Sequence, residues 1–452
     1  MSKQRAIDGT AHYGVARRHL VSGWPSTSGS HDAAANAILN SAGLAGPWRF
    51  YTERLTVAGR WFLFATGAFL VSGLNSLELQ AYVPLVYAFS LWLVALLIVL
   101  LSRPRVGLTT HHADRVCAGE TLPVEVGIEA QGRRGFGLFG SELCVVPHRL
   151  PPVIDVVPAE GGLISVPAPH EKARARLGLK CHRRGVYRLQ GFRVQTSFPL
   201  GLLRAYRAFV EERRLLVYPA FTPLARLEIP SGRRFHPGGV ALASHLGDSF
   251  EFSGNREYRE GDNWRDLDWR ATARLNKPVV REYIEEYFLR VAVVLDTHLP
   301  PGAGDAQRAA FERAVSLCAA VGDYMASQEY IVDIFAAGPH LYHLTAGRGI
   351  AYLDQILDIL ACVEENPSEP FGALEPEILE NLEQINTIIC VFLDWNETRR
   401  AFLERLRGGG AGIMAIIVRD APCTLDPDAD RVLFGPLPVV SRAMFEAGIE
   451  EL

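Results

Sequence analysis

The seven cysteines of this 452-residue sequence include no pair at metal-binding or redox spacing. A zinc ribbon needs two Cys-x-x-Cys pairs and a thioredoxin-type site needs one, so neither class of site has support here. Widely spaced thiols without a pairing pattern predict reduced, buried side chains in a cytosolic compartment.

An excess of positive charge is also missing. The formal net charge is −4 at pH 7, so no overall electrostatic field draws the chain toward nucleic acid. Residues 1–48 lack the apolar core of a signal peptide and any sustained periodicity, and they are rich in Ala, Gly and Ser. We therefore expect a disordered cytosolic tail over this range.

Charged side chains are absent from two long apolar runs, residues 61–77 and 81–101. A membrane-spanning helix needs about 20 apolar residues, with about 17 as the lower limit. The alternative is a pair of buried core helices, but uncharged runs of this length are rare in soluble domains. The pattern predicts a two-helix transmembrane hairpin within residues 49–105.

The charges beside these runs predict how the hairpin is oriented. Its connection carries one acidic residue, whereas its two outer ends are flanked by arginines, at Arg49, Arg54, Arg60, Arg103 and Arg105. Because positive charge stays on the cytoplasmic side, we expect a multi-pass protein of the cytoplasmic (inner) membrane. Both termini and everything after residue 105 would then be cytosolic.

Residues 106–225 contain short apolar runs that Pro and Gly interrupt at regular intervals. This spacing is typical of an all-β, sandwich-like domain. His111 and His112 are adjacent, and neighbouring side chains of a strand point to opposite faces. We therefore expect no metal site in this domain.

The densest polar stretch lies within the next segment, residues 226–288. Between residues 254 and 283 it intersperses Asp262, Asp266 and Asp268 with arginines and aromatic residues. The spacing predicts a helix over 263–275 with Asp262 as its N-cap.

On that predicted helix, Trp264, Leu267 and Ala271 have the spacing of a buried stripe. Asp266 and Arg270 have the i, i+4 spacing of a helical ion pair.

Three functions are compatible with this polar stretch. A hydrolase would use Asp262, Asp266 and Asp268 as converging carboxylates, but neighbouring arginines lower carboxylate pKa values and make poor general bases of them. Nucleic-acid binding would use the arginines and aromatics, but the interspersed acids cancel their field. A structural or docking clamp, a polar network around a capped helix, fits the composition best.

Residues 289–452 alternate apolar runs with helical segments. This order predicts an α/β domain with a parallel sheet and helices on both faces. Binding sites of such sheets form at the carboxyl ends of the strands. Asp296 and Asp394 each follow a predicted strand, which makes them candidate metal ligands. The alternative is that loop amides satisfy both aspartates. The glycine run 408–412 lies between a helix and a strand, the wrong order for a phosphate-binding loop.

Several phrases resemble the membrane proteins of domain-of-unknown-function family 58. Members carry Arg-Arg-Gly-x-Tyr, Pro-Leu-Gly-Leu and Val-Tyr-Pro phrases, which occur here at residues 183–187, 199–202 and 217–219. The family's core phrase also occurs. It resembles Tyr-Arg-x-Gly-Asp, followed by Asp/Ile-x-Trp and then by Ala-Arg. Its residues in this chain are Tyr258, Arg259, Gly261, Asp262, Asp268, Trp269 and Arg274.

The C-terminal half resembles von Willebrand A domains, which have a Rossmann-type fold. Their first strand ends in Asp-x-Ser-x-Ser, and those oxygens bind Mg²⁺ with a later aspartate. Here Asp296 matches the first aspartate and Asp394 the later one, while His298 and Pro300 replace the serines. The resemblance therefore implies a degenerate metal site. We expect no required cofactor, with Mg²⁺ at Asp296 and Asp394 as the alternative.

The resemblance implies a scaffold or adaptor rather than an enzyme. Family members work beside MoxR-type AAA+ ATPases, so the expected function is a membrane-anchored, cytosol-facing module in the assembly or maturation of protein complexes. Its expected partners are the lipid bilayer and a MoxR-type ATPase, without nucleic acid. The alternatives are a hydrolase at Asp262, Asp266 and Asp268, or a purely structural component of the cell envelope.

Overall fold

The computed structural model describes most of the chain after residue 49. The described residues are 50–75, 79–101, 104–130, 142–165, 172–230, 252–260, 262, 264–283, 289–338, 340–346, 350–449 and 451. They fall into two compact units, divided between residues 220 and 221, and each is described by itself. The tail predicted for residues 1–48 lies outside the described residues.

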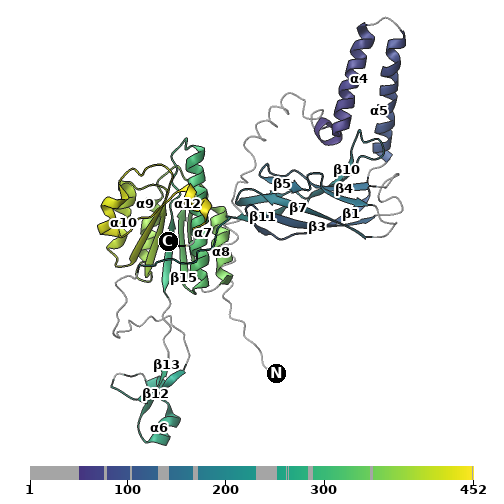
Figure 1. Cartoon of the computed structure of the whole chain (residues 1–452). Coiled ribbons are helices and arrows are strands. Elements are labelled where there is room, and N and C mark those ends of the chain that lie inside the picture. The colour runs from purple at the N-terminus through teal and green to yellow at the C-terminus, as the bar shows by residue number, and fades with distance from the viewer. Residues whose placement is uncertain are drawn as a thin grey trace. The chain divides into compact units, whose positions relative to one another are not determined.

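Two apolar helices open the first unit: α4 (Val57–Asn75) and α5 (Val83–Leu101) (Figure 1). Both are long and apolar enough to cross a membrane, and 11 % of each apolar window is buried within the structure. The predicted pair of apolar helices is confirmed, with shifted bounds. Helix α4 begins before the uncharged run and includes Arg60, because the Thr56 hydroxyl accepts a hydrogen bond from the Gly59 amide at 2.9 Å and starts the helix there.

A short backbone ladder joins this helix pair to the β-rich part of the unit. Leu55 and Leu203 form an antiparallel bridge. The Thr56 amide donates to the Leu202 carbonyl at 3.2 Å, and the Arg204 amide donates to the Arg54 carbonyl at 2.7 Å. Leu55, Leu202 and Leu203 are buried with Ala95 of α5 in one small cluster. The base of the helices is therefore fixed to the β-sheets by both hydrogen bonds and packing.

Three sheets follow the helices. Their orders are β1-β3-β7-β5, β10-β9-β4-β6 and β2-β11-β8. The strands are β1 (Val106–His111), β2 (Arg115–Cys117), β3 (Thr121–Ala130), β4 (Glu142–Pro147), β5 (Ile154–Val157), β6 (Gly162–Ser165), β7 (Lys172–Cys181), β8 (Gly185–Leu189), β9 (Phe192–Thr196), β10 (Ala205–Phe209) and β11 (Arg213–Tyr218).

One apolar core lies between these sheets. Along β7, Ala173, Ala175, Leu177 and Leu179 are buried while the residues between them face outward, the alternation expected of a half-buried strand. All three sheets contribute to the same cluster, for example through Leu122, Val194 and Leu215. The predicted all-β region after the helices is therefore present as several sheets around a shared core.

The second unit contains a six-stranded mixed sheet in the order β16-β15-β14-β17-β18-β19. Its strands are β14 (Arg290–Leu295), β15 (Ile331–Ala337), β16 (Leu341–Ala346), β17 (Thr387–Phe392), β18 (Gly412–Val418) and β19 (Val439–Val440). Neighbouring strands are parallel except for β15 and β16, which are antiparallel. The predicted α/β domain is confirmed. The prediction of a parallel sheet did not include the antiparallel edge strand β16.

Helices cover both faces of this sheet (Figure 1). On one face α7 (Asp305–Ser327) packs against α8 (Ile350–Cys362), and on the other α9 (Phe371–Asn381) packs against α10 (Glu397–Arg407). Shorter helices α11 (Arg431–Phe434) and α12 (Arg442–Ala447) follow. Phe371 of α9 and Phe402 of α10 pack with Phe392 of β17, so aromatic rings fill the space beneath these two helices.

The second unit also contains a two-stranded hairpin that carries the polar stretch. Strands β12 (Phe252–Glu257) and β13 (Val279–Tyr283) pair in antiparallel fashion. Between them lie a 3₁₀ turn (Trp264–Asp266) and helix α6 (Trp269–Leu275).

The joint between α4 and the β-sheets predicts a position-specific effect of side-chain size. A Cβ atom at Gly59 would lie 2.1 Å from the Leu202 carbonyl oxygen, whereas one at Gly67 of the same helix would meet nothing within 4 Å. We expect Gly59→Ala to destabilise the protein by about 1–3 kcal/mol, because the backbone of the joint must move. Gly67→Ala is the matched control. Thermal unfolding in detergent measures the stability of both variants. Equal Tm values would contradict the close packing of Gly59 against the Leu202 carbonyl.

Candidate functional site

Two acids of the polar stretch, Asp262 and Asp268, are held by partners within the hairpin. Asp262 accepts two hydrogen bonds from the Arg256 guanidinium, at 2.7 and 2.8 Å, and one from the Arg259 amide at 2.8 Å. The Arg256 hydrogen bond, followed by the one from the Arg259 amide, lowers the pKa of Asp262 to about 2. A carboxylate so firmly ionised is a poor proton acceptor near neutral pH.

The prediction of Asp262 as the helix N-cap is wrong, because Asp268 occupies that position. Helix α6 begins at Trp269, and Asp268 caps it by accepting hydrogen bonds from the Arg270 and Ala271 amides, each at 3.0 Å. The hydrogen bond from Ala271 is the largest cause of a lowered pKa at Asp268, and Arg281 adds an ion pair at 3.4 Å. Asp266 ends the 3₁₀ turn before the cap, so it does not share a helix with Arg270 as the predicted ion pair requires.

The hairpin presents two large aromatic side chains to solvent. Trp264 is 68 % exposed and Trp269 is 67 % exposed, while Leu267 and Ala271 are buried. The predicted buried stripe is thus wrong at Trp264, because residues 264–266 form a separate turn and do not continue α6. Tyr258 lies beside Trp264, with ring centroids 5.5 Å apart.

For the other residues of the family phrase, the structure gives fewer contacts. Arg274 lies in the last turn of α6, and Arg259 contributes its backbone amide to Asp262. Gly261 lies outside the described residues.

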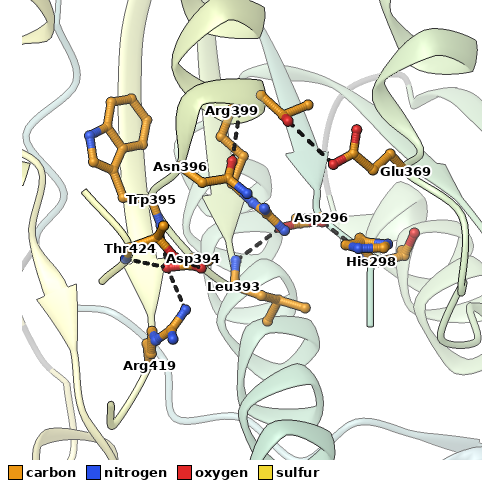
Figure 2. A network of polar contacts seen from close by, with 12 residues as sticks. Asp296, His298, Glu369, Leu393, Asp394, Trp395, Asn396, Arg399, Arg419 and Thr424 are labelled. Atoms are coloured by element: carbon orange, nitrogen blue, oxygen red, sulfur yellow. Dashed lines mark hydrogen bonds and ion pairs between the residues drawn. The ribbon is translucent and has the colours of Figure 1, made fainter. Parts of the chain in front are cut away.

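The second candidate site is at the carboxyl end of the parallel strands in the α/β sheet (Figure 2). Asp296 follows β14 and has no exposed surface. The Arg399 guanidinium contacts its Oδ2 through Nε at 2.8 Å and through Nη2 at 2.6 Å. The amides of His298 and Leu393 also donate to the Asp296 carboxylate, each at 3.0 Å.

Arg399 is positioned by the start of α10. Asn396 caps this helix by accepting a hydrogen bond from the Arg399 amide at 3.1 Å. This fixes the first turn and places the arginine, which is 3 % exposed, against Asp296. The guanidinium also lies over the Phe371 ring, 5.6 Å from its centroid. An internal cation therefore neutralises the buried carboxylate.

Asp394 lies two residues after β17 and has its own set of partners. It accepts hydrogen bonds from the Trp395 amide at 2.8 Å and from the Thr424 amide and hydroxyl, at 3.1 and 2.6 Å. Arg419 forms an ion pair with it. Burial acts to raise the pKa of Asp394, but the contacts with Thr424 and Arg419 outweigh burial and hold it below its usual value.

These arrangements do not fit a Mg²⁺ site between Asp296 and Asp394. Each carboxylate is already matched with an arginine and with backbone amides. The Thr297 hydroxyl donates to the Ala337 carbonyl, so it is also engaged. Among the residues that the structure describes, no group of three or more His, Cys, Asp and Glu side chains could hold a metal. Mg²⁺ prefers free oxygen ligands, and this site offers few.

Arg399 is not among the candidate residues predicted from the sequence, although its helix carries a signal for it. Arg399 shares the spacing i, i+3, i+4, i+7 with Phe402, Leu403 and Leu406, all of which are buried. A charged residue on the apolar stripe of a helix predicts a buried partner of opposite charge.

Comparison with known proteins supports the family resemblance in this part of the chain. Residues 254–420 match the model of a family described as "Protein of unknown function DUF58". The match includes all but the first two residues of the hairpin, and also Asp296, Asp394 and Arg399. The chain is also 25 % identical over 201 residues to Uncharacterized protein YeaD of Bacillus subtilis (strain 168), covering 41 % of this chain and 48 % of that protein. The chain thus spans about half the length of this relative.

The buried pair predicts a large effect of removing its cation. Arg399→Met leaves Asp296 unpaired in the interior, and we expect the free energy of unfolding to fall by about 3–5 kcal/mol. Arg407→Met is the control, because Arg407 is exposed on the same helix and should change stability by less than about 0.5 kcal/mol. Adding Asp296→Asn to Arg399→Met should recover part of the loss. Chemical unfolding in detergent measures these free energies. Equal losses of stability in Arg399→Met and Arg407→Met would refute the role of Arg399.

The lowered pKa of Asp262 predicts how the hairpin responds to acid. Its folded pKa of about 2 lies below the ordinary value of 3.8, so its stabilising contribution is present above about pH 4 and disappears as the pH falls toward 2. We expect Asp262→Asn to lower Tm at pH 7 and the difference from wild type to shrink between pH 4 and 2. A difference in Tm that stays constant across this range would rule out the ionised pair as the source of stability.

Proposed function

We propose that this chain, whose residues 254–420 match the DUF58 family, is a membrane-anchored scaffold that docks a partner protein through its β12–β13 hairpin. The single observation that carries this proposal is the exposure of Trp264 and Trp269 on a hairpin in which Asp262 and Asp268 have internal partners. Large exposed aromatic side chains are typical of the centre of a protein interface.

The hairpin is preorganised for docking. Asp262 ties the Arg256 side chain of β12 to the turn at Arg259, and Asp268 fixes the start of α6 directly before Trp269. Binding then requires little further ordering of the backbone, which reduces the entropy lost on association. Ordered aromatics with arginines nearby form a surface that is better suited to recognising protein than to proton transfer.

The α/β unit supports a scaffold over an enzyme. The carboxylates at the ends of β14 and β17 are neutralised by Arg399 and Arg419. We interpret the unit as von Willebrand A-like with the cation supplied by the chain itself. Its role as an interaction module would then be independent of divalent metal.

The anchor is the α4–α5 pair, with both ends of the pair on the cytosolic side. The apolar windows of the two helices support membrane insertion, and the arginines at the base, Arg54 and Arg60, support the orientation by the positive-inside rule. The soluble units then face the cytosol, where a MoxR-type AAA+ ATPase is the partner that the family resemblance suggests.

The proposed docking surface predicts a loss of binding without a loss of folding. We expect Trp264→Ala/Trp269→Ala to weaken co-purification of the MoxR-type ATPase by about tenfold or more, the effect of removing two interface aromatics. Tm should stay near that of wild type, because both side chains are exposed. Val432→Ala/Met444→Ala, at exposed positions of the α/β unit, is the control.

Two outcomes of this co-purification and one outcome of membrane extraction would count against the proposal. Full binding by the tryptophan variant would exclude the hairpin as the docking surface. Failure of wild type to retain the ATPase would leave a structural envelope component as the better explanation. Release of the wild-type protein from membranes by alkaline carbonate would exclude the anchor.

A further inference from the structure

Four arginines gather where the helix pair meets the β-sheets: Arg54, Arg60, Arg193 and Arg204, here called the arginine cluster. The bridge between Leu55 and Leu203 brings the first two beside the last, and the Arg54 Nη1 atom reaches the Arg204 carbonyl at 3.5 Å. Each of the four side chains is half-buried. The cluster combines residues about 150 positions apart in the chain, so sequence spacing alone does not reveal it.

One aromatic ring holds two members of the cluster. The Arg54 guanidinium lies over the Tyr206 ring, 4.4 Å from its centroid, and that of Arg193 lies 5.9 Å from the same centroid. The Tyr206 hydroxyl donates to the Glu53 carboxylate at 2.7 Å. Glu53 is thus engaged with Tyr206, while cation–π contacts orient the two guanidinium groups.

The cluster contains donors without acceptors. The buried Nε atoms of Arg60 and Arg193 have no hydrogen-bond partner. Within the described residues, neither Arg193 nor Arg204 forms an ion pair, in contrast to Arg256, Arg399 and Arg419 of the second unit. A buried donor that loses water without gaining an acceptor is unfavourable. The Nε donors of Arg60 and Arg193 could therefore bind an external acceptor.

Burial and the positive charges of the cluster lower the pKa values of one of its members, Arg204, and of the neighbouring His148. Burial lowers the pKa of Arg204, and the charges of Arg193 and Arg60 lower it further. Burial also lowers the pKa of His148, with Arg149 and then Arg193 adding to the effect. An anion at the cluster would relieve this repulsion.

Apolar surface continues directly from the cluster. A shallow pocket lies between the end of α5 and the β9–β10 connection, and its apolar lining includes Ala95, Ile98, Val99, Phe198, Leu200 and Leu203. Phe198 and Leu200 are also exposed to solvent. Thr196 and Ser197 also line this shallow pocket. A positive site next to a partly apolar pocket, at the base of two apolar helices, matches a phosphate group joined to the start of an acyl chain.

We propose that the arginine cluster binds the phosphate group of an anionic membrane phospholipid, with the start of an acyl chain in the adjoining pocket. The bound lipid satisfies the free Nε donors and locks the joint between the helix pair and the β-sheets. This inference rests on the membrane anchoring proposed above, but not on the identity of the partner protein.

The test uses the full-length protein, stripped of lipid in detergent. Phosphatidylglycerol and phosphatidylcholine are added back separately, and bound lipid is counted by native mass spectrometry. We expect wild type to bind phosphatidylglycerol about tenfold or more tightly than phosphatidylcholine, since each arginine near an anionic headgroup contributes measurably. Equal binding of the two lipids by wild type would overturn the proposal without any variant.

Paired variants then locate the site. Arg193→Gln/Arg204→Gln should remove most of the preference for phosphatidylglycerol. Arg174→Gln/Arg176→Gln, on an exposed part of β7, makes the same change in net charge and should keep the preference. Equal losses in the two double variants would show a diffuse charge effect and overturn the assigned site.

Further measurements separate the source of the phosphate and the underlying anchor. Inorganic phosphate in excess should not displace phosphatidylglycerol, because it lacks the acyl chain. Displacement would show a site for free anions and overturn the lipid assignment. Alkaline carbonate extraction of wild type tests anchoring independently, so an anchored protein without lipid preference would refute this inference alone.

Discussion

The buried carboxylate of Asp296 requires a cation, and the α/β unit is built so that Arg399 supplies it. The pair joins the end of β14 to the first turn of α10, and the Leu393 amide adds the end of β17 to the same contact. A fully buried aspartate without this partner would carry an uncompensated charge in a medium of low dielectric constant. The strand order places β14 beside β17. The Asn396 cap and the Phe371 ring hold the Arg399 guanidinium beside Asp296. The carboxyl end of the sheet, where α/β proteins commonly bind ligands, is thus closed by the chain itself.

Arginine neutralises carboxylates in the same way elsewhere in the second unit. Arg419 pairs with Asp394, Arg256 with Asp262, and Arg281 with Asp268. In each case the acid also accepts backbone hydrogen bonds, so charge and local backbone geometry are fixed together. The arginine cluster of the first unit breaks this pattern, because Arg193 and Arg204 have no acidic partner among the described residues. Arginine therefore occurs in two settings: paired with carboxylates in the second unit, and in a half-buried positive cluster at the base of the apolar helices in the first.

Sequence patterns could predict those features that depend on neighbouring residues. Uncharged runs identified α4 and α5, and the alternation of apolar strands with helices identified the α/β unit and placed Asp296 and Asp394 after strands. The start of α4 could not be read from the run, because Thr56 begins the helix upstream of Arg60. Asp268 caps α6 while Asp262 pairs with Arg256 of β12, and local spacing does not distinguish these two roles. The partner of Asp296 lies 103 residues away, a separation that local periodicity cannot reveal.

The closed strand ends and the exposed hairpin together favour recognition over catalysis. A catalytic carboxylate needs a pKa close to the working pH and access to a substrate. The pKa values of Asp262, Asp268 and Asp394 are lowered instead, and Asp296 is fully buried against Arg399. What remains available is the opposite kind of surface: Trp264 and Trp269 on a braced hairpin, and arginines beside apolar helices. The first suits a folded protein partner and the second suits a lipid headgroup. These two surfaces are the ones through which the proposed scaffold would hold a partner protein at a membrane.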